Sequence, residues 1–454
     1  MEAAALYRRE AEVYRRNGDF NGAKVEELKA DRYSSDLQVF VEPPRHLGKP
    51  MPLHPVARYE PLSGCYIGAF IDRDERLGRR FLDEGSQAHQ SPDAFARVTG
   101  KKHASVFWYL AYGKRFPASW VYRLQDRKVA AHIAWEPNDG LDWVDDDAYL
   151  NDFARAAGRT NAPIFLRFAS EMNGSWTRYG ADPLQYKIKW AIVQRAMARY
   201  APNVAMVWCV NSIPEEPIAK FYPGDEYVDW VGVNCYSVPY HDNDPRRGAL
   251  RENPADLLKF VYNHYARSKP LMVCEYGASH RGAADNVERP EWAARKLREM
   301  YAALPRLYPR IKAIQLYDMN NLVWAEAGRQ LSNYSVTDSD TVLAAYAQAI
   351  RPEYFLSTLG EEEGAPAPLF RLTPGAVVPA RLASNGILRV SAWARCYSDR
   401  FAVEYALDGR TIARFNEFGT FETTVPGAGS GLRTLTATLT DDRGNVTVRR
   451  QYRI

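Results

Sequence analysis

The sequence predicts an α/β fold: a (β/α)8 barrel of the TIM type, with an N-terminal helical extension and a C-terminal β-sandwich. Between residues 61 and 358, short apolar runs alternate with amphipathic stretches eight times. Eight such units over about 300 residues are what this barrel requires. Beyond residue 360 the pattern changes to short alternating runs separated by turn residues. We therefore expect three parts, at residues 1–60, 61–358 and 366–454.

Residues 1–60 are predicted to form a helical hairpin followed by a proline-rich linker. Apolar residues recur at helical spacing as far as Leu37, and the run Asn17-Gly18-Asp19 interrupts them like a helix C-cap and turn. The prolines from Pro43 to Pro61 are typical of an extended linker. A single hairpin cannot bury its own apolar face. It either packs against the main domain or binds a protein partner, and the sequence leaves both open.

The barrel strands are predicted from apolar runs rich in strand-forming residues. These runs are Cys65–Ile71, Ala104–Tyr109, Val129–Trp135, Ile164–Ser170, Val204–Val210, Trp230–Tyr236, Leu271–Cys274 and Ile311–Tyr317. Helices are predicted between them at Asp147–Arg159, Leu184–Tyr200, Pro254–Ser268, Pro290–Leu304 and Thr341–Ile350. A doubly wound open sheet has the same alternation, but no glycine-rich turn follows the first run to open a nucleotide-binding fingerprint. The barrel is therefore the favoured architecture.

The C-terminal region, residues 366–454, is predicted to be a small β-sandwich. A charged, proline-bearing segment at residues 361–368 separates it from the barrel. Its predicted strands are Ile387–Ala394, Phe401–Leu407, Arg410–Phe415, Phe421–Val425, Leu432–Leu439 and Val446–Tyr452. Turn residues such as Asp408-Gly409 lie between them. The region resembles bacterial immunoglobulin-like modules, which are common on exported enzymes.

Composition narrows the function classes. The 454 residues carry 59 basic and 55 acidic side chains, a net charge of +4, which is too even to indicate nucleic acid or an anionic membrane surface as partner. Aromatic residues make up 13% of the chain, which is compatible with stacking on sugars. The five cysteines are scattered and odd in number, so no disulfide framework is indicated. No zinc motif, phosphate loop or apolar run of about 18 residues is present, so we expect no cofactor and no membrane insertion.

Two glutamates directly follow barrel strands. Glu171 comes at the end of the fourth apolar run, and Glu275 ends the seventh. Catalytic groups of such barrels lie at the C-terminal ends of strands, so we expect both carboxyl groups at one mouth. Cleavage of a glycosidic bond needs paired carboxylates, one to protonate the leaving oxygen and one to attack the sugar or activate water. The alternative is that Glu171 is simply a solvated strand end, as most loop carboxylates are.

Five segments of the barrel, in order on strands four to eight, carry a resemblance to a known family. They are Arg167–Trp176, Asn203–Asn211, Phe221–Asn234, Lys269–Gly277 and Tyr308–Ala313. They resemble glycoside hydrolase family 26, which contains β-mannanases, mixed-linkage β-glucanases and β-xylanases, and the resemblance covers about residues 60–355. It implies that Glu171 is the acid/base and Glu275 the nucleophile of a retaining reaction. It also implies that Tyr236 hydrogen-bonds the nucleophile and that Trp176 faces the substrate.

Three positions depart from the family's pattern. The family usually has a His before the acid/base, where this chain has Ser170. It usually ends the eighth strand with a Trp, where this chain has Leu316-Tyr317, and it has a Gly where this chain has Cys235. The first change affects the grip on the sugar or the tuning of the acid, and the second alters the shape of the subsite. An unusual polysaccharide is therefore favoured over plain mannan.

Strand parity assigns directions to the neighbours of the two glutamates. Arg167 should share the inward face of Glu171, where it would orient or charge-balance a carboxylate, or form a purely structural ion pair. Cys235 and Cys274 immediately precede residues expected to point inward, so both should face the helices as small core residues. The candidate substrate-binding residues are Trp176, Tyr236, Tyr317, Trp108, Trp135, Ser170, Arg167 and Asn173. For Trp108 and Trp135, which lie near strand ends, packing in the core is the alternative.

The sequence thus favours an endo-acting, retaining β-glycoside hydrolase that cleaves a polysaccharide without a metal or cofactor. The polysaccharide would be a β-glucan, mannan, xylan or bacterial exopolysaccharide. The alternative is a non-catalytic glycan-binding or scaffolding protein of a surface-polysaccharide system, and a third hypothesis is an assembly subunit that binds partners through its helices and sandwich. We expect a soluble, mature or trimmed chain located outside the cytoplasm: periplasmic, secreted or on the cell surface.

Overall fold

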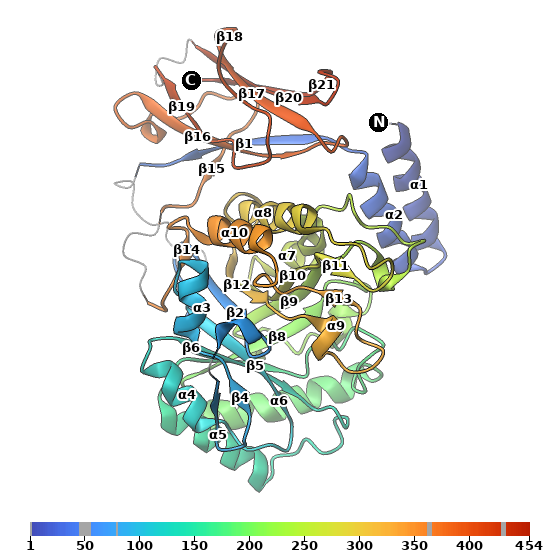
Figure 1. Ribbon diagram of the computed structural model, residues 1–454, viewed down its shortest axis with the longest axis vertical. Helices are drawn as coiled ribbons and strands as arrows, with labels where there is room; N and C mark the ends of the chain where they lie inside the picture. Colours follow the sequence, from blue (N-terminus) through green and yellow to red (C-terminus); the bar gives the residue numbers. More distant parts are fainter. Residues whose placement is uncertain (1, 45–55, 79, 361–365, 428–432) are drawn as a thin grey trace.

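The computed structural model describes residues 2–44, 56–78, 80–360, 366–427 and 433–454. Its centre is a closed barrel of parallel strands (Figure 1). The barrel strands are β2 (Cys65–Phe70), β5 (Ser105–Ala111), β6 (Ala130–Glu136), β7 (Ile164–Phe168), β8 (Val204–Asn211), β9 (Trp230–Ser237), β10 (Leu271–Ala278) and β12 (Ile311–Tyr317). They pair in chain order, and β12 pairs with β2 to close the ring. The predicted fold class is confirmed.

Helices cover the outside of the barrel, broadly where the sequence predicts them. They are α3 (Pro92–Thr99), α4 (Ala118–Gln125), α5 (Ala148–Thr160), α6 (Pro183–Tyr200), α7 (Lys259–Tyr265), α8 (Pro290–Leu307), α9 (Asn321–Trp324) and α10 (Asp340–Ile350). Aspartate caps start two of them: Asp147 accepts from the backbone N–H of Leu150, and Asp182 from that of Leu184. After β8 only short 3₁₀ turns connect to β9. None of the helices in the described part is long and apolar enough to cross a membrane.

The C-terminal region forms two antiparallel four-stranded sheets. One contains β15 (Phe370–Arg371), β1 (Asp36–Glu42), β16 (Ile387–Arg395) and β19 (Thr423–Pro426), and the other contains β18 (Arg410–Phe415), β17 (Phe401–Leu407), β20 (Thr434–Asp441) and β21 (Val446–Arg453). Buried residues of both sheets share one core, as in a sandwich. The immunoglobulin-like identity of this region stays a prediction.

Strand β1 was not expected from the sequence. It comes from the N-terminal part of the chain, yet it pairs with β16 along its whole length, and Figure 1 shows it in blue among the orange strands. Leu37, Val39 and Val41 enter the sandwich core, while Phe40 on the opposite face joins the core of the barrel. One strand with two apolar faces therefore belongs to both cores. The central part of the predicted linker, residues 45–55, lies outside the described residues, as do residues 361–365.

The N-terminal hairpin consists of α1 (Glu2–Arg16) and α2 (Phe20–Arg32). Leu28 of α2 is buried in the barrel core, and Lys24 forms a 2.6 Å ion pair with Glu215. Of the two alternatives for the hairpin, the structure thus shows packing against the main domain. Leu6 and Val13 of α1 remain exposed, and binding of a protein partner there stays a prediction.

One charged junction joins all three parts of the molecule. Arg395 of β16 pairs with Asp256 of the barrel and lies 3.5 Å from Asp31 of α2. Asp31 also pairs with Lys259 at 3.0 Å. The two arginine-bound carboxylates are largely buried, and removing one partner from such a group leaves an uncompensated charge. This junction therefore fixes the sandwich and hairpin on the barrel.

Two buried aspartates join the loops that follow β2 and β12. The carboxyl groups of Asp74 and Asp318 interact with each other, and one oxygen of each has no other hydrogen-bond partner among the described residues. Asp318 also accepts from the backbone N–H of Val336 at 2.7 Å, and Asp74 from that of Arg76 at 2.8 Å. Burial, more than the mutual repulsion, raises the pKa of Asp318 well above its usual value, and burial also raises that of Asp74. The pair shares a proton, because two adjacent buried carboxylates cannot both ionise.

We expect Arg395→Met to lower the free energy of unfolding by roughly 2–3 kcal/mol, because Asp256 keeps only Lys259 as a cation. Chemical denaturation measures the change. The control is Arg389→Met on the same strand, whose 3.9 Å pair with Glu42 is largely exposed and should contribute less than about 1 kcal/mol. Equal effects of the two substitutions would contradict the role of the junction.

Asp318→Asn should remove a pH dependence of stability. A raised folded pKa stabilises the protein below the unfolded value, and this contribution is lost as the pH rises through the folded value. The amide introduced by Asp318→Asn can donate a hydrogen bond to Asp74 at any pH, because it does not titrate. The wild type should therefore lose stability relative to the variant as the pH rises, by up to about 1.4 kcal/mol per pH unit. Denaturation at several pH values measures the difference, with the exposed Asp139→Asn as control. A difference that does not vary with pH would rule out the shared proton.

Candidate active site

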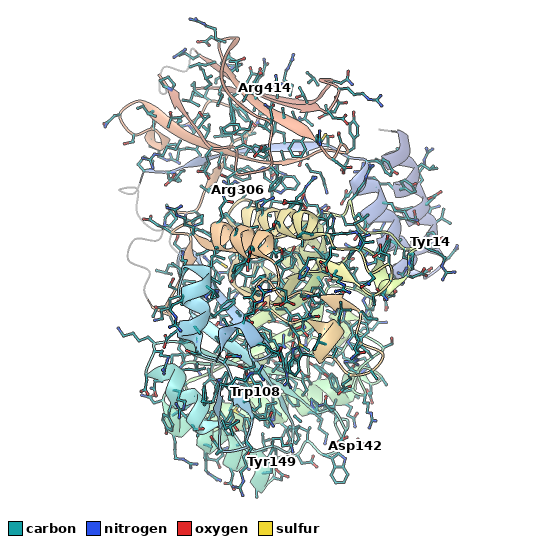
Figure 2. All side chains as sticks on the ribbon, in the orientation of Figure 1. Tyr14, Trp108, Asp142, Tyr149, Arg306 and Arg414 are labelled. Atoms are coloured by element: carbon teal, nitrogen blue, oxygen red, sulfur yellow. The ribbon has the colours of Figure 1, made fainter. Side chains whose placement is uncertain are left out.

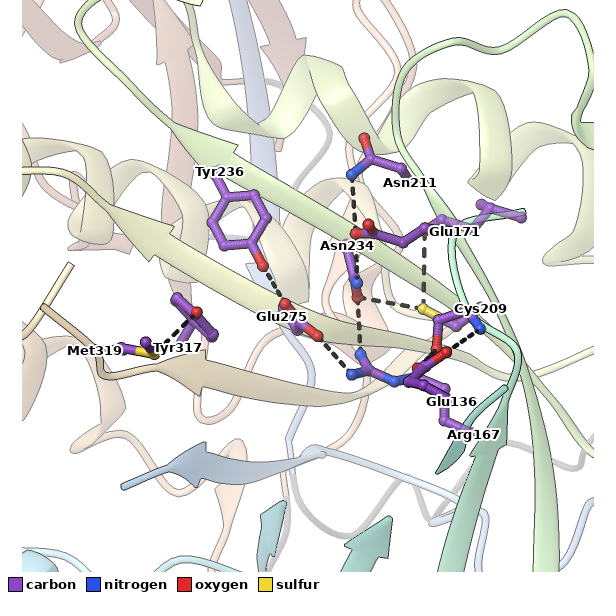
Figure 3. Close-up of polar contacts among 12 residues, drawn as sticks. Glu136, Arg167, Glu171, Cys209, Asn211, Asn234, Tyr236, Glu275, Tyr317 and Met319 are labelled. Atoms are coloured by element: carbon purple, nitrogen blue, oxygen red, sulfur yellow. Dashed lines mark hydrogen bonds and ion pairs between the residues drawn. The ribbon is translucent and has the colours of Figure 1, made fainter. Parts of the chain in front are cut away.

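The candidate site lies at the carboxyl ends of β7, β8, β9 and β10, where a connected network of side chains joins the two predicted glutamates (Figure 3). Asn234 of β9 is the link. Its amide nitrogen donates to Glu171 at 2.8 Å, and its carbonyl oxygen accepts from Arg167 at 3.1 Å. Arg167 in turn donates to Glu275. The structure therefore brings together two carboxyl groups that are 104 positions apart in the sequence.

Glu275 is held by a buried cation. Glu275, on β10, is only 4% exposed. One carboxylate oxygen accepts from Arg167, which is completely buried, and the other accepts from the hydroxyl of Tyr236. The guanidinium of Arg167 also lies 5.6 Å from the ring centres of Phe107 and Tyr109. Arg167 thus balances the charge of a carboxylate, the first of the two roles expected for it, and the pair fixes the direction of Glu275.

Glu171 is held by neutral donors. One carboxylate oxygen accepts from the amides of Asn211 at 3.0 Å and Asn234 at 2.8 Å, and the other accepts from the indole N–H of Trp176 at 2.7 Å. Burial raises the pKa of Glu171, and the charge of Glu275 raises it further, against the smaller opposing effect of the three hydrogen bonds. The two carboxyl groups therefore differ in environment: one has a cation, and the other has only amide and indole partners.

The backbone around Glu171 is strained. Ala169 and Glu171 both have positive φ, 46° and 58°, which costs a non-glycine residue roughly 1–2 kcal/mol. The backbone N–H of Glu171 donates to the carbonyl of Cys209 at 2.9 Å and secures the turn. Such strain clusters at functional sites, where the surrounding structure enforces it. Here the turn begins directly after β7 and places the Glu171 side chain beside Asn211 and Asn234.

Aromatic side chains line one end of the network. Tyr317, at the end of β12, stacks on Phe70 with ring centres 5.8 Å apart and meets Tyr236 edge to face at 5.5 Å. Its hydroxyl donates to Asn321 at 3.1 Å. Tyr317 therefore lies next to the residue that donates to Glu275, where the sequence placed a substitute for the family's tryptophan. Burial raises the pKa of both tyrosines well above 10, so both hydroxyls stay protonated.

Trp176 is half exposed beside Glu171. Its indole covers Gly174 so closely that a Cβ at that position would lie 2.3 Å from the ring. Gly174 is therefore required for the ring to reach Glu171. An exposed ring next to the proposed acid agrees with the substrate-facing position that the sequence indicates.

Ser170 and Asn173, which were predicted to bind substrate, are instead hydrogen-bonded within the protein. The Ser170 hydroxyl donates to Glu136 at 2.6 Å, and Tyr179 donates to the same carboxylate at 2.8 Å. The side-chain amide of Asn173 donates to the backbone carbonyls of Asn211 and Pro214. Both side chains are buried, and they brace the loop that carries Glu171.

Trp135 and Trp108 also lie away from the site, because their positions on β6 and β5 direct their side chains toward the helices. Trp135 is fully buried and stacks on Phe153 of α5 with ring centres 3.9 Å apart. Trp108 packs on His89 and on Trp120 of α4. Both predictions of substrate contact are corrected: these rings belong to the layer between barrel and helices. On β5 the neighbouring residue Tyr109 takes the inward position instead.

The parity prediction is wrong for Cys274. A register shift interrupts β10 between Val273 and Glu275, so Cys274 packs inside the barrel near Cys209, in the cluster beneath Arg167. A bulge lets successive residues point to the same side. Cys235 packs in the cluster between barrel and helices, as expected.

The sequence analysis gave no role to Asn211 or Asn234. Asn211 ends β8, and this position was the signal that could have identified it. Asn234 lies inside β9, where no such signal marks it. In the part of the chain that the structure describes, no group of three or more His, Cys, Asp or Glu side chains could hold a metal ion.

Comparison with known proteins relates part of the barrel to a known family. Residues 147–251 match the model of glycosyl hydrolase family 26, a segment that includes Glu171, Asn211 and Asn234. The β-1,3-xylanase TXYA of a Vibrio species is 31% identical over 142 residues, 31% of this chain and 28% of the relative. Endoglucanase H of Acetivibrio thermocellus is 24% identical over 310 residues, 63% of this chain and 30% of the relative.

The chain thus spans less than a third of the length of these relatives. Among solved structures, an endo-β-1,4-mannanase double mutant of Cellulomonas fimi is similar with a TM-score of 0.47 and 17% identity, covering 86% of this chain and 94% of that one. The family match over residues 147–251, which contain the fourth to sixth barrel strands, agrees with the resemblance seen in the sequence. This part of the chain is similar to glycosyl hydrolase family 26.

Proposed function

We propose that this protein is an endo-acting, retaining β-glycoside hydrolase that cleaves a polysaccharide by double displacement. The observation that carries the proposal is the contrast between the two glutamates. Glu275 is paired with the buried cation of Arg167, which suits a nucleophilic carboxylate. Glu171 has a raised pKa and only neutral partners, which suits a proton donor.

In the first step, Glu275 attacks the anomeric carbon while Glu171 transfers its proton to the glycosidic oxygen, and the bond between sugar and leaving group breaks. Tyr236 and Arg167 hold the attacking carboxylate in place. In the second step, Glu171 takes a proton from water, and the water oxygen attacks the anomeric carbon and releases Glu275. The Glu171 proton is thus restored, and the chemistry needs no cofactor.

The relatives named above suggest the substrate class: a β-linked polysaccharide such as a xylan, glucan or mannan. Such polymers are too large to cross a membrane unaided, which supports our proposal that the protein acts outside the cytoplasm. Tyr317 and Ser170 stand where family members usually have Trp and His, so we propose a substrate other than plain mannan. A non-catalytic glycan binder is not favoured, because both carboxyl groups are present in one network.

Glu275→Gln should reduce hydrolysis to background, and Glu171→Gln should reduce it by roughly 10²–10⁴-fold. The second variant should regain its first step on aryl glycosides whose leaving group needs no proton. Activity is measured as reducing ends and product lengths over a panel of β-glycans. The anomeric configuration of the first product, determined by NMR, shows whether the reaction retains it. Glu404→Gln in the sandwich is the control. Full activity of Glu275→Gln would refute the mechanism, and a panel on which wild type releases no reducing ends would favour the glycan-binding alternative.

Asn211→Ala should move the alkaline limb of the pH–activity profile to higher pH. The amide of Asn211 donates to Glu171 and lowers its pKa, so removing the amide raises that pKa further. Activity requires protonated Glu171 and is lost as the pH rises through this value. The profile of kcat/KM measures the shift. A limb that stays in place or moves to lower pH would show that another group donates the proton.

A further inference from the structure

Trp143 is unusual among the described residues, since no other large apolar side chain has as high an exposed fraction, 74%. It lies in the loop at residues 137–147 that follows β6 at the catalytic end of the barrel. Figure 2 labels its neighbour Asp142 at the lower edge of the barrel, far from Arg414 in the sandwich. The mechanism above gives this ring no role.

The loop is built so that Trp143 stays in solvent. Leu141 and Val144 on either side of it are buried in the barrel core. Asp142 accepts from the amide of Gln185 at 2.7 Å, and Asp145 accepts from Lys189 at 2.8 Å, both on α6. Four anchors around one residue make a loop in which the indole has a defined direction. A ring fixed in this way loses little conformational freedom on binding a ligand.

The loop is continuous with the rim that carries Trp176. Asp139 lies 4.0 Å from Arg178, two residues beyond Trp176. The strand that leads into the loop ends at Glu136, which accepts from Ser170 and Tyr179 of the Glu171 loop. Trp176 and Trp143 are thus two exposed indoles on adjacent loops of one barrel mouth. A polymer that passes Glu171 can reach both.

The surroundings of Trp143 favour a neutral sugar chain. The loop carries five aspartates, at positions 139, 142, 145, 146 and 147, of which Asp139 is mostly exposed and offers acceptors for hydroxyl groups. Leu184 and Ile188, exposed on α6 next to the residues that anchor the loop, add apolar surface. A flat ring with nearby acceptors suits the C–H face and hydroxyls of a pyranose. The same carboxylates would repel a polyanion.

We propose that Trp143 is the platform of a remote glycan-binding site that holds a distant pyranose unit of a neutral polysaccharide while its bond is cleaved at Glu171 and Glu275. The identity of that polymer rests on the proposed function. We expect the site to act on long chains only, because Trp143 lies on a different loop from Trp176 and from both glutamates.

The test uses the full chain with Glu275→Gln, so that binding is measured without turnover. Affinity for galactomannan, lichenan and β-1,3-xylan, and for tetrasaccharides of each, is compared with and without Trp143→Ala. We expect Trp143→Ala to weaken binding of the bound polymer roughly three- to tenfold and to leave tetrasaccharide binding unchanged. Trp143→Phe should keep most of the affinity. Tyr122→Ala removes an exposed ring of α4 as the matched control.

Equal polymer affinity with and without Trp143 would overturn the proposal, as would equal losses for polymer and tetrasaccharide, or no binding of any polymer by the parent. The result is separable from the proposed function. Polymer binding that depends on Trp143, together with a wild type that releases no reducing ends, would refute hydrolysis and leave the remote site standing.

Discussion

The buried ion pair between Arg167 and Glu275 is the interaction on which the site depends. A guanidinium with no exposed surface at the centre of a barrel is costly unless its charge is balanced and its N–H groups are bonded. Glu275 supplies the charge, and Asn234 and two aromatic rings supply further contacts. Because Asn234 also bonds to Glu171, the cation that orients one carboxylate indirectly positions the other.

The same network explains how one barrel mouth keeps two carboxyl groups chemically distinct. Glu275 lies deep, beside a cation and a tyrosine hydroxyl. Glu171 sits on a strained turn, nearer the surface, with neutral donors and an exposed indole. A polar second layer holds that turn: Ser170 and Tyr179 on Glu136, and Asn173 on the backbone after β8. Side chains that were predicted to bind sugar instead hold the loop that carries Glu171, the proposed acid.

The three parts of the chain are more closely joined than their composition indicates. A strand near the N-terminus completes a sheet of the C-terminal sandwich, and its other face packs on the barrel. Arg395 adds a charge contact between the sandwich, the hairpin and the barrel. A strand from the N-terminal part and the C-terminal strands thus form one sandwich that packs on the barrel.

The sequence by itself determined the eight barrel strands, most helices and the two glutamates, because these depend on local apolar periodicity and on position at strand ends. It also indicated Tyr236, Tyr317 and Trp176 through the resemblance of short motifs. Only the tertiary structure decided that Asn234 links the glutamates, that Cys274 turns inward at a bulge, and that Trp108, Trp135, Ser170 and Asn173 serve packing and bracing. Register shifts and contacts between distant loops set these directions, and neither leaves a periodic signal in the sequence. The pairing of β1 with β16 was hidden for the same reason, since its two partners are about 350 residues apart in the chain.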